Sequence, residues 1–145
     1  MDALPHHYTA VASCSAARSG VTVAAEGVPD LKTDAPSQFG GPGNQWSPEE
    51  LLMAAVADCF VLTFRAISTA SNVSWTTVEC SATGTLDRVE RNNLFTEIAL
   101  AVSVTAGADV NNKLLERLLH KAEEACLITN SLSAPVSLSA TIHRG

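Results

Sequence analysis

Apolar residues recur with two different periods along this chain, and the periods separate expected strands from expected helices. Residues 76–87 and 93–105 alternate between apolar and polar side chains, which is typical of half-buried strands. Asn92-Asn93 between them has turn chemistry, so we expect a hairpin. Residues 134–143 alternate in the same way and predict a last strand.

Two segments have helical periodicity. Ser47 begins the first one: it is a good N-cap, Pro48 fits the first helical position, and Glu50 completes a capping box. This helix should run over residues 48–70, and its middle is apolar almost all round, so we expect a partner subunit to cover part of it. Residues 110–125 carry leucines and alanines at 3–4 spacing and predict an amphipathic helix.

The N-terminal third of the chain reads as a strand pair followed by a loop. Residues 8–15 and 21–25 predict a hairpin, whereas residues 26–46 are rich in glycine and proline and predict a long loop. The element order ββ–α–ββ–α–β indicates an α+β fold with a mostly antiparallel sheet. At 145 residues, we expect residues 1–145 to form a single domain.

Charge and composition narrow the class of partner. The net charge of −6 and the scattered basic residues argue against binding of nucleic acid or of an anionic membrane surface. The N-terminus has no signal-peptide pattern, and the longest apolar stretch, residues 51–67, carries Asp58 and Arg65. We therefore expect a cytoplasmic protein without a membrane-spanning segment, in which cysteines stay free or redox-active.

Four cysteines are the first candidates for chemistry. Cys59 lies in the apolar helix and Cys126 at the end of the amphipathic one, while Cys14 and Cys80 fall in strand patterns. Free cysteine is often a small buried hydrophobic residue, so the residues alone leave a core role open for all four.

Two charged residues are equally ambiguous on the residues alone. Arg18 is expected at a hairpin tip, where arginines are usually solvated, and the helix dipole accounts for Glu49 in a first helical turn. We expect no metal site, because His120 and Cys126 do not have a usual zinc spacing.

The pattern of motifs changes this picture. The run SPEELLMAAVADCF over residues 47–60 resembles the helix-start signature of the OsmC and organic hydroperoxide resistance (Ohr) proteins, in which S-P-E is followed by a cysteine ten residues after the glutamate, as Cys59 follows Glu49. Further segments resemble this family's N-terminal hairpin and loop and its second motif, K-A-H-x-x-C-P-x-S-N: Tyr8-Thr9-Ala10, Arg18-Ser19-Gly20, Glu26-Gly27, residues 39–43, His120-Lys121-Ala122, Cys126 and Asn130. The resemblance covers nearly the whole chain.

The resemblance implies a role for each of four residues. Cys59 matches the peroxide-attacking cysteine, Cys126 the resolving cysteine, Arg18 the arginine that stabilises the thiolate, and Glu49 its ion-pair partner. The implied activity is reduction of an organic hydroperoxide to an alcohol through a Cys59 sulfenic acid and a Cys59–Cys126 disulfide. An external thiol, dithiol or lipoyl-type reductant then reopens the disulfide, and no bound cofactor is needed.

The family fold implies an intertwined homodimer in which sheets wrap two central helices, with apolar candidates around the site at Phe39, Leu52, Phe60, Leu62 and Phe64. Two alternatives stay open: a non-catalytic member of the fold that binds an apolar ligand, and a cysteine-based redox sensor.

Departures from the family pattern next to the two cysteines bear on the site. Leu127 stands where the family has proline, so the second helix could run on through Cys126, and Thr129 stands in place of serine. Asp58 stands beside Cys59, where the family has a small residue. It would raise the pKa of the Cys59 thiol if both faced one cavity, or it could pair with Arg65 or Arg18.

Overall fold

The structure is a computed structural model that describes all 145 residues. Its chain forms two compact units, Met1–Leu52 and Met53–Gly145. That residues 1–145 act as one domain stays a prediction.

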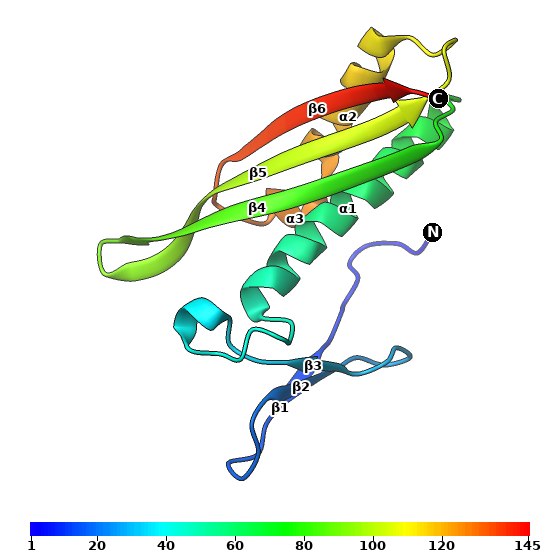
Figure 1. The fold of residues 1–145 in the computed structure, drawn as a ribbon. Helices are drawn as coiled ribbons and strands as arrows, with labels where there is room; N and C mark the ends of the chain where they lie inside the picture. The colour runs from blue at the N-terminus through cyan, green and yellow to red at the C-terminus, as the bar shows by residue number, and fades with distance from the viewer. The chain divides into compact units, whose positions relative to one another are not determined.

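The first unit is built on a small antiparallel sheet of order β1-β2-β3. β1 (Val11–Ser13) and β2 (Val21–Ala24) form the expected hairpin, although β1 is shorter than predicted (Figure 1). β3 (Leu31–Thr33) lies inside residues 26–46, so the prediction of one uninterrupted loop was wrong. A three-residue strand is too short to show an alternating pattern, and only its pairing with β2 reveals it.

The rest of that segment is compact and depends on glycine. A short 3-10 helix, η1 (Ser37–Phe39), ends at Gly40, whose φ of 86° is left-handed. A Cβ atom at Gly41 would collide with the Ala35 carbonyl group. These two glycines therefore allow the chain to turn tightly before the first long helix.

The first long helix, α1 (Pro48–Ala70), has the predicted bounds. The Ser47 hydroxyl accepts a hydrogen bond from the backbone N–H of Glu50 at 3.1 Å. The same hydroxyl donates to the Glu50 carboxylate at 2.9 Å, so the carboxylate accepts from the hydroxyl here rather than from the Ser47 backbone N–H. Ser47 thus caps the helix as expected.

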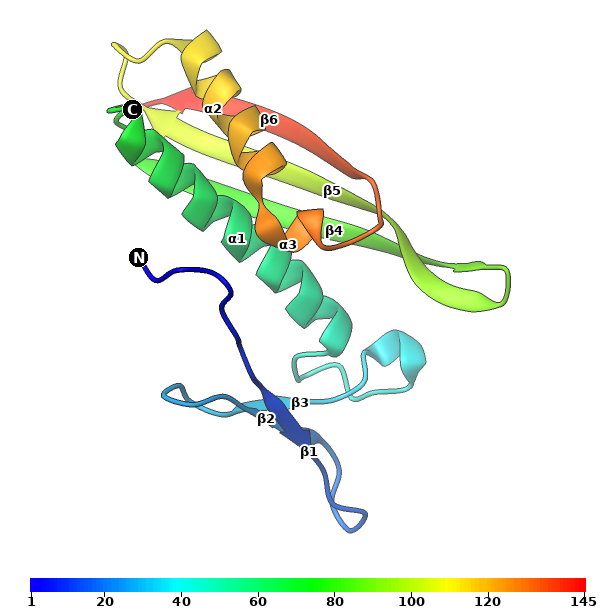
Figure 2. The same cartoon turned by 180° about the vertical axis from the view of Figure 1, so that it is seen from behind.

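The second unit is a three-stranded sheet with helices packed on one face. β4 (Thr77–Val89) pairs antiparallel with β5 (Asn92–Ala106), which pairs parallel with β6 (Val136–Arg144). Three of the four strand pairings in the chain are therefore antiparallel. α1 and α2 (Asn112–Ala125) lie on the same face of this sheet (Figure 2).

The β4–β5 turn lies two residues before the predicted position. Glu90 and Arg91 form the loop with φ values of 49° and 74°, and Val89 pairs with Asn92. Two successive residues with positive φ make the kind of turn that follows the twist of a hairpin. The expected turn at Asn92-Asn93 was wrong, because strand register outweighed the local turn preference of asparagine.

The core of the second unit lies between its sheet and its helices. It consists of Val56, Phe60, Phe64, Ile98, Leu100, Val102, Val104, Ala106, Leu115, Leu118, Leu119 and Ala122. Asn111 caps α2, since its side chain accepts from the Leu114 N–H at 3.2 Å.

α1 is less enclosed than its composition predicts. Its fully buried residues form one stripe at four-residue spacing, namely Val56, Phe60, Phe64 and Ser68. By length and composition alone the helix could also span a membrane, a property that it shares with core helices of soluble proteins. Much of its apolar surface has no cover within the single chain.

Candidate active site

The structure brings Cys59 and Cys126 together. Cys59 is half-buried on α1, and Cys126 is fully buried between α2 and the short helix α3 (Leu127–Asn130). Both are free thiols, and Cys59 lies close enough to Cys126 to lower the pKa of its thiol. The pair is therefore close enough for direct sulfur chemistry.

The pKa of Cys126 is set by opposing effects. Burial raises it, but hydrogen bonds to the thiolate from Thr129, the Cys59 side chain and the Ile128 backbone lower it, and the net shift is downward. In this pair Cys126 is therefore the thiol whose charged form the contacts favour.

The chain breaks its helix at Cys126 without the family's proline. Cys126 is extended, with φ −67° and ψ 107°, so the expectation that α2 could run on was wrong. The side-chain amide of Asn130 donates to the Glu124 carbonyl at 3.0 Å, and the Thr129 hydroxyl donates to the Cys126 carbonyl at 3.1 Å. These two hydrogen bonds satisfy carbonyl groups at the end of α2, so the helix can end there without a proline.

The sequence marks Thr129 only as a departure from the family motif, and the structure places it at the candidate site. It is only 7% exposed, and it contacts both the carbonyl and the thiolate of Cys126. The available signal was that threonine keeps the hydroxyl of the serine that it replaces in the second motif.

Asp58 does not share the environment of Cys59. It is exposed and forms no ion pair with Arg65 or Arg18, since the one ion pair in the chain joins His120 to Glu123 at 3.7 Å. Cys59 instead has Thr63 as a neighbour, with 3.9 Å between sulfur and hydroxyl. Successive helical residues point about 100° apart, which separates the carboxylate from the thiol.

The other two cysteines differ in burial. Cys80 is half-buried on β4 and packs against the core of the second unit. Burial, with a smaller contribution from the negative charge of Cys126, raises the pKa of Cys80 to about 11, so this thiol stays protonated at neutral pH. Cys14 is exposed and follows β1.

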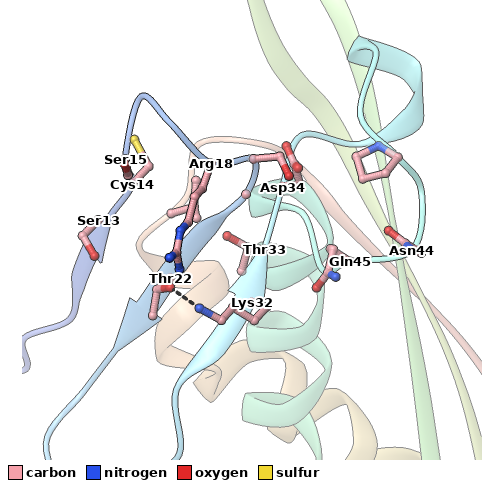
Figure 3. A pocket seen from close by; sticks show the side chains of 14 residues that line it. Ser13, Cys14, Ser15, Arg18, Thr22, Lys32, Thr33, Asp34, Asn44 and Gln45 are labelled. Carbon is pink, nitrogen blue, oxygen red and sulfur yellow. Dashed lines mark hydrogen bonds between the residues drawn. The ribbon is translucent and has the colours of Figure 1, made fainter.

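Arg18 lies in the β1–β2 connection of the first unit and is exposed. It lines a cavity of about 590 Å³ together with Lys32, Thr22 and Asp34 (Figure 3). It makes no ion pair, so the expected partnership of Arg18 with Glu49 is absent from the single chain.

Glu49 has an unusual environment in the first turn of α1. Its Oε1 atom is buried and has no hydrogen-bond partner. The residue lines a second, mainly apolar cavity of about 490 Å³ with Phe39 and Leu51. A buried carboxylate oxygen without a donor is destabilising, so this position is suited to an incoming cation or N–H group.

The other apolar residues that were expected around the site lie partly in the core and partly on the surface. Phe60 and Phe64 are fully buried core residues, whereas Leu62 is 53% exposed. Leu52 is half-buried on α1.

Comparison with known families and proteins supports the motif resemblance. A model of the OsmC-like protein family matches residues 41–141. An uncharacterised protein of Bacillus subtilis, YmaD, is 24% identical over 92% of this chain and 91% of its own length. Peroxiredoxin OsmC of Escherichia coli is 28% identical over 63% of this chain and 64% of its own length.

Solved structures share the fold. An OsmC-like protein of unknown function from Vibrio cholerae has a TM-score of 0.86 at 19% identity, covering 94% of this chain and 100% of that one. An organic hydroperoxide resistance protein from Elizabethkingia anophelis has a TM-score of 0.78 at 19% identity and covers 100% of both chains. The predicted α+β fold of OsmC type is thereby confirmed.

Proposed function

Because this chain belongs to the OsmC-like protein family, we propose that it is a thiol peroxidase that reduces organic hydroperoxides to alcohols. The observation that carries the proposal is that two free thiols lie near each other: Cys59 is among the neighbours that lower the pKa of Cys126. The names of two relatives, a peroxiredoxin and an organic hydroperoxide resistance protein, agree with this chemistry.

In the proposed reaction the Cys59 thiolate attacks the distal peroxide oxygen. A sulfur–oxygen bond forms, the oxygen–oxygen bond breaks, and the alkoxide leaves as the alcohol after taking up a proton. The Cys126 thiolate then attacks the sulfur of the Cys59 sulfenic acid, a sulfur–sulfur bond forms, the sulfur–oxygen bond breaks, and hydroxide leaves as water after taking up a proton. An external dithiol of lipoyl type restores both thiols by exchange.

Arg18 is proposed to favour the thiolate form of Cys59. The contacts within the single chain favour the charge on Cys126, yet the first step requires it on Cys59. A guanidinium group beside Cys59 would favour its thiolate over the Cys126 thiolate. We assign this role to Arg18.

Glu49 is proposed to hold Arg18 in that working position. Its orphaned oxygen lacks a donor, and the Arg18 guanidinium lacks an acid. A bidentate ion pair would satisfy both groups and fix the orientation of the guanidinium.

We further propose that the working form is a cytoplasmic homodimer. The support is the apolar surface of α1 that the single chain leaves uncovered, including Leu62. Contiguous exposed apolar surface on a helix usually marks an interface. Equilibrium sedimentation at micromolar concentration tests it: a monomer would contradict this part of the proposal.

The proposed function is tested by peroxide consumption. Reduced protein is mixed with tert-butyl hydroperoxide and a dithiol, and the remaining peroxide is measured over time. Cys59→Ser should abolish consumption, while Cys80→Ser, a matched change of a half-buried thiol that has no role in the reaction, should keep most of it. Equal and slow consumption by the wild type and Cys59→Ser would reject the peroxidase.

The same experiment distinguishes a peroxidase from a redox sensor and from a protein that binds an apolar ligand. Stoichiometric oxidation of Cys59 without turnover would favour a redox sensor. No oxidation, together with saturable binding of an apolar ligand, would favour a binding protein that uses the apolar cavity beside Glu49.

A further inference from the structure

We propose that the polar cavity of the first unit binds a small oxyanion with two negative charges, such as phosphate, between Arg18 and Lys32. Neither the family resemblance nor the proposed reaction assigns a role to Lys32. The cavity occupies about 590 Å³, enough for such an ion with some of its water.

The two cations converge because of strand register. Thr22 on β2 pairs with Lys32 on β3, and the Lys32 ammonium group donates to the Thr22 hydroxyl at 2.6 Å. Figure 3 shows the guanidinium end of Arg18 directed toward the same threonine. Thr22 therefore marks the point at which both positive charges meet.

The charge inside the cavity is unbalanced. Neither Arg18 nor Lys32 forms an ion pair, and Asp34 is the one acidic residue in the lining. The Asp34 carboxylate already accepts a hydrogen bond from the Ala35 backbone N–H at 2.8 Å. Two like charges at close range repel, and a dianion between them would relieve that repulsion.

The remaining lining suits an oxyanion and not an apolar ligand. It supplies hydroxyl and amide groups that can donate to oxygen, from Ser13, Ser15, Ser19, Thr33, Asn44 and Gln45. The site is open to solvent, so we expect affinity in the millimolar range, as is usual for exposed charges.

Such an anion would regulate the proposed peroxidase, and this consequence rests on the proposed function. Arg18 would be needed both by the anion in this cavity and by the orphaned Glu49 oxygen. A bound dianion would hold Arg18 and so slow the oxidation of Cys59.

Binding is tested on the full reduced protein with inorganic phosphate at constant ionic strength, because salt alone screens exposed charges. Backbone amide shifts of Thr22, Lys32 and Thr33 should change and saturate. Lys32→Ala should weaken binding about fivefold, whereas Lys121→Ala, a matched removal of an exposed lysine in the second unit, should leave it unchanged. Acetate, a monoanion, should bind more weakly than phosphate.

Shifts that stay linear in concentration, that are the same for acetate and phosphate, or that are unaffected in Lys32→Ala would overturn the site. The kinetic arm is separate: phosphate should slow peroxide oxidation of Cys59 in the wild type and less so in Lys32→Ala, which keeps its activity without phosphate. If the protein consumes no peroxide, the proposed function fails, and the binding experiment still shows whether the anion site exists.

If phosphate binds but does not slow the reaction, the proposed regulation by the anion fails.

Discussion

Two pairs of candidate site residues differ in their contacts within the single chain. Cys59 and Cys126 of the second unit have partners there, whereas Arg18 and Glu49 of the first unit do not. Cys59 lies near Cys126, and together with other neighbours it lowers the pKa of the Cys126 thiol. Arg18 is exposed without an acid, and Glu49 has a buried oxygen without a donor.

The difference has a physical cause. Cys59 lies on α1 and Cys126 lies at the end of α2, and both helices are held in place by burial of a shared apolar core, which is the main driving force of folding. The charged pair lies on a hairpin connection and a helix start in a unit with little core of its own. We infer that sulfur chemistry is prearranged in this protein, whereas its electrostatic activation depends on a later rearrangement.

The largest effect should come from the core that holds the thiols. Phe60→Ala removes a fully buried ring next to Cys59 and should lower the free energy of unfolding by about 3–5 kcal/mol. Chemical denaturation measures it. Phe39→Ala in the first unit, where the ring is 55% exposed, should cost far less, and similar losses for both would contradict the contrast between the units.

Arg18→Ala tests the charged half of the site. A cation near a thiolate shifts its pKa by about 1–3 units, so its loss should slow Cys59 oxidation about 100-fold at neutral pH. Stopped-flow mixing with peroxide measures the rate. Arg91→Ala, in the exposed β4–β5 turn, is the control and should react as the wild type does.

Cys80 makes stability depend on pH in a predictable direction. Its pKa rises from 9.0 to about 11 on folding, so between these values the folded chain keeps a proton that the unfolded chain loses. Stability should therefore fall by about 2 kcal/mol as pH rises through this window. Cys80→Val should lessen the fall measured by denaturation at pH 8 to 11, and Cys14→Val should not.

Glu49→Gln should change activity and stability in opposite directions. Without the carboxylate, Arg18 loses its proposed partner, and Cys59 oxidation should slow about tenfold. Removing a buried, unpartnered charged oxygen should leave the protein as stable or about 1 kcal/mol more stable. Glu50→Gln is the neighbouring control for activity. A destabilised Glu49→Gln variant would show that the oxygen is already paired.

The smallest effect is expected at Thr129. Thr129→Val removes a hydroxyl that lowers the pKa of Cys126, so disulfide formation should slow about threefold near neutral pH and recover as pH rises. Quenched-flow alkylation followed by mass spectrometry measures it, and Thr129→Ser should restore the rate. An unchanged pH profile would leave Thr129 a purely structural role.

Long helices and strands were predictable because the periodic pattern of apolar and polar residues recurs many times in each. The bounds of α1 follow from Ser47 and Pro48 together with the apolar run behind them. β4 and β5 were found to within about two residues, yet their turn was misplaced, since cross-strand register is a non-local property. β3 was missed for the same reason.

At the candidate site, too, some features were predictable from the sequence and others were not. The family resemblance implies that Cys59 and Cys126 are partners, but it could not show that the pKa of Cys126 is lowered, because that depends on hydrogen bonds from Thr129 and Ile128. Nor could it place Asp58 away from Cys59, because a side chain's direction depends on how the helix packs.

The α+β class and the helix that carries Cys59 follow from local periodicity and from the helix-start motif in the sequence, whereas the pairing of Cys59 with Cys126 is what the family resemblance implies. Only the tertiary structure decided the break of α2 at Cys126, the meeting of Arg18 and Lys32 at Thr22, and the isolation of the Glu49 oxygen. Each of these depends on segments distant in sequence, whose contacts are selected by burial and by hydrogen-bond satisfaction and not by any local pattern.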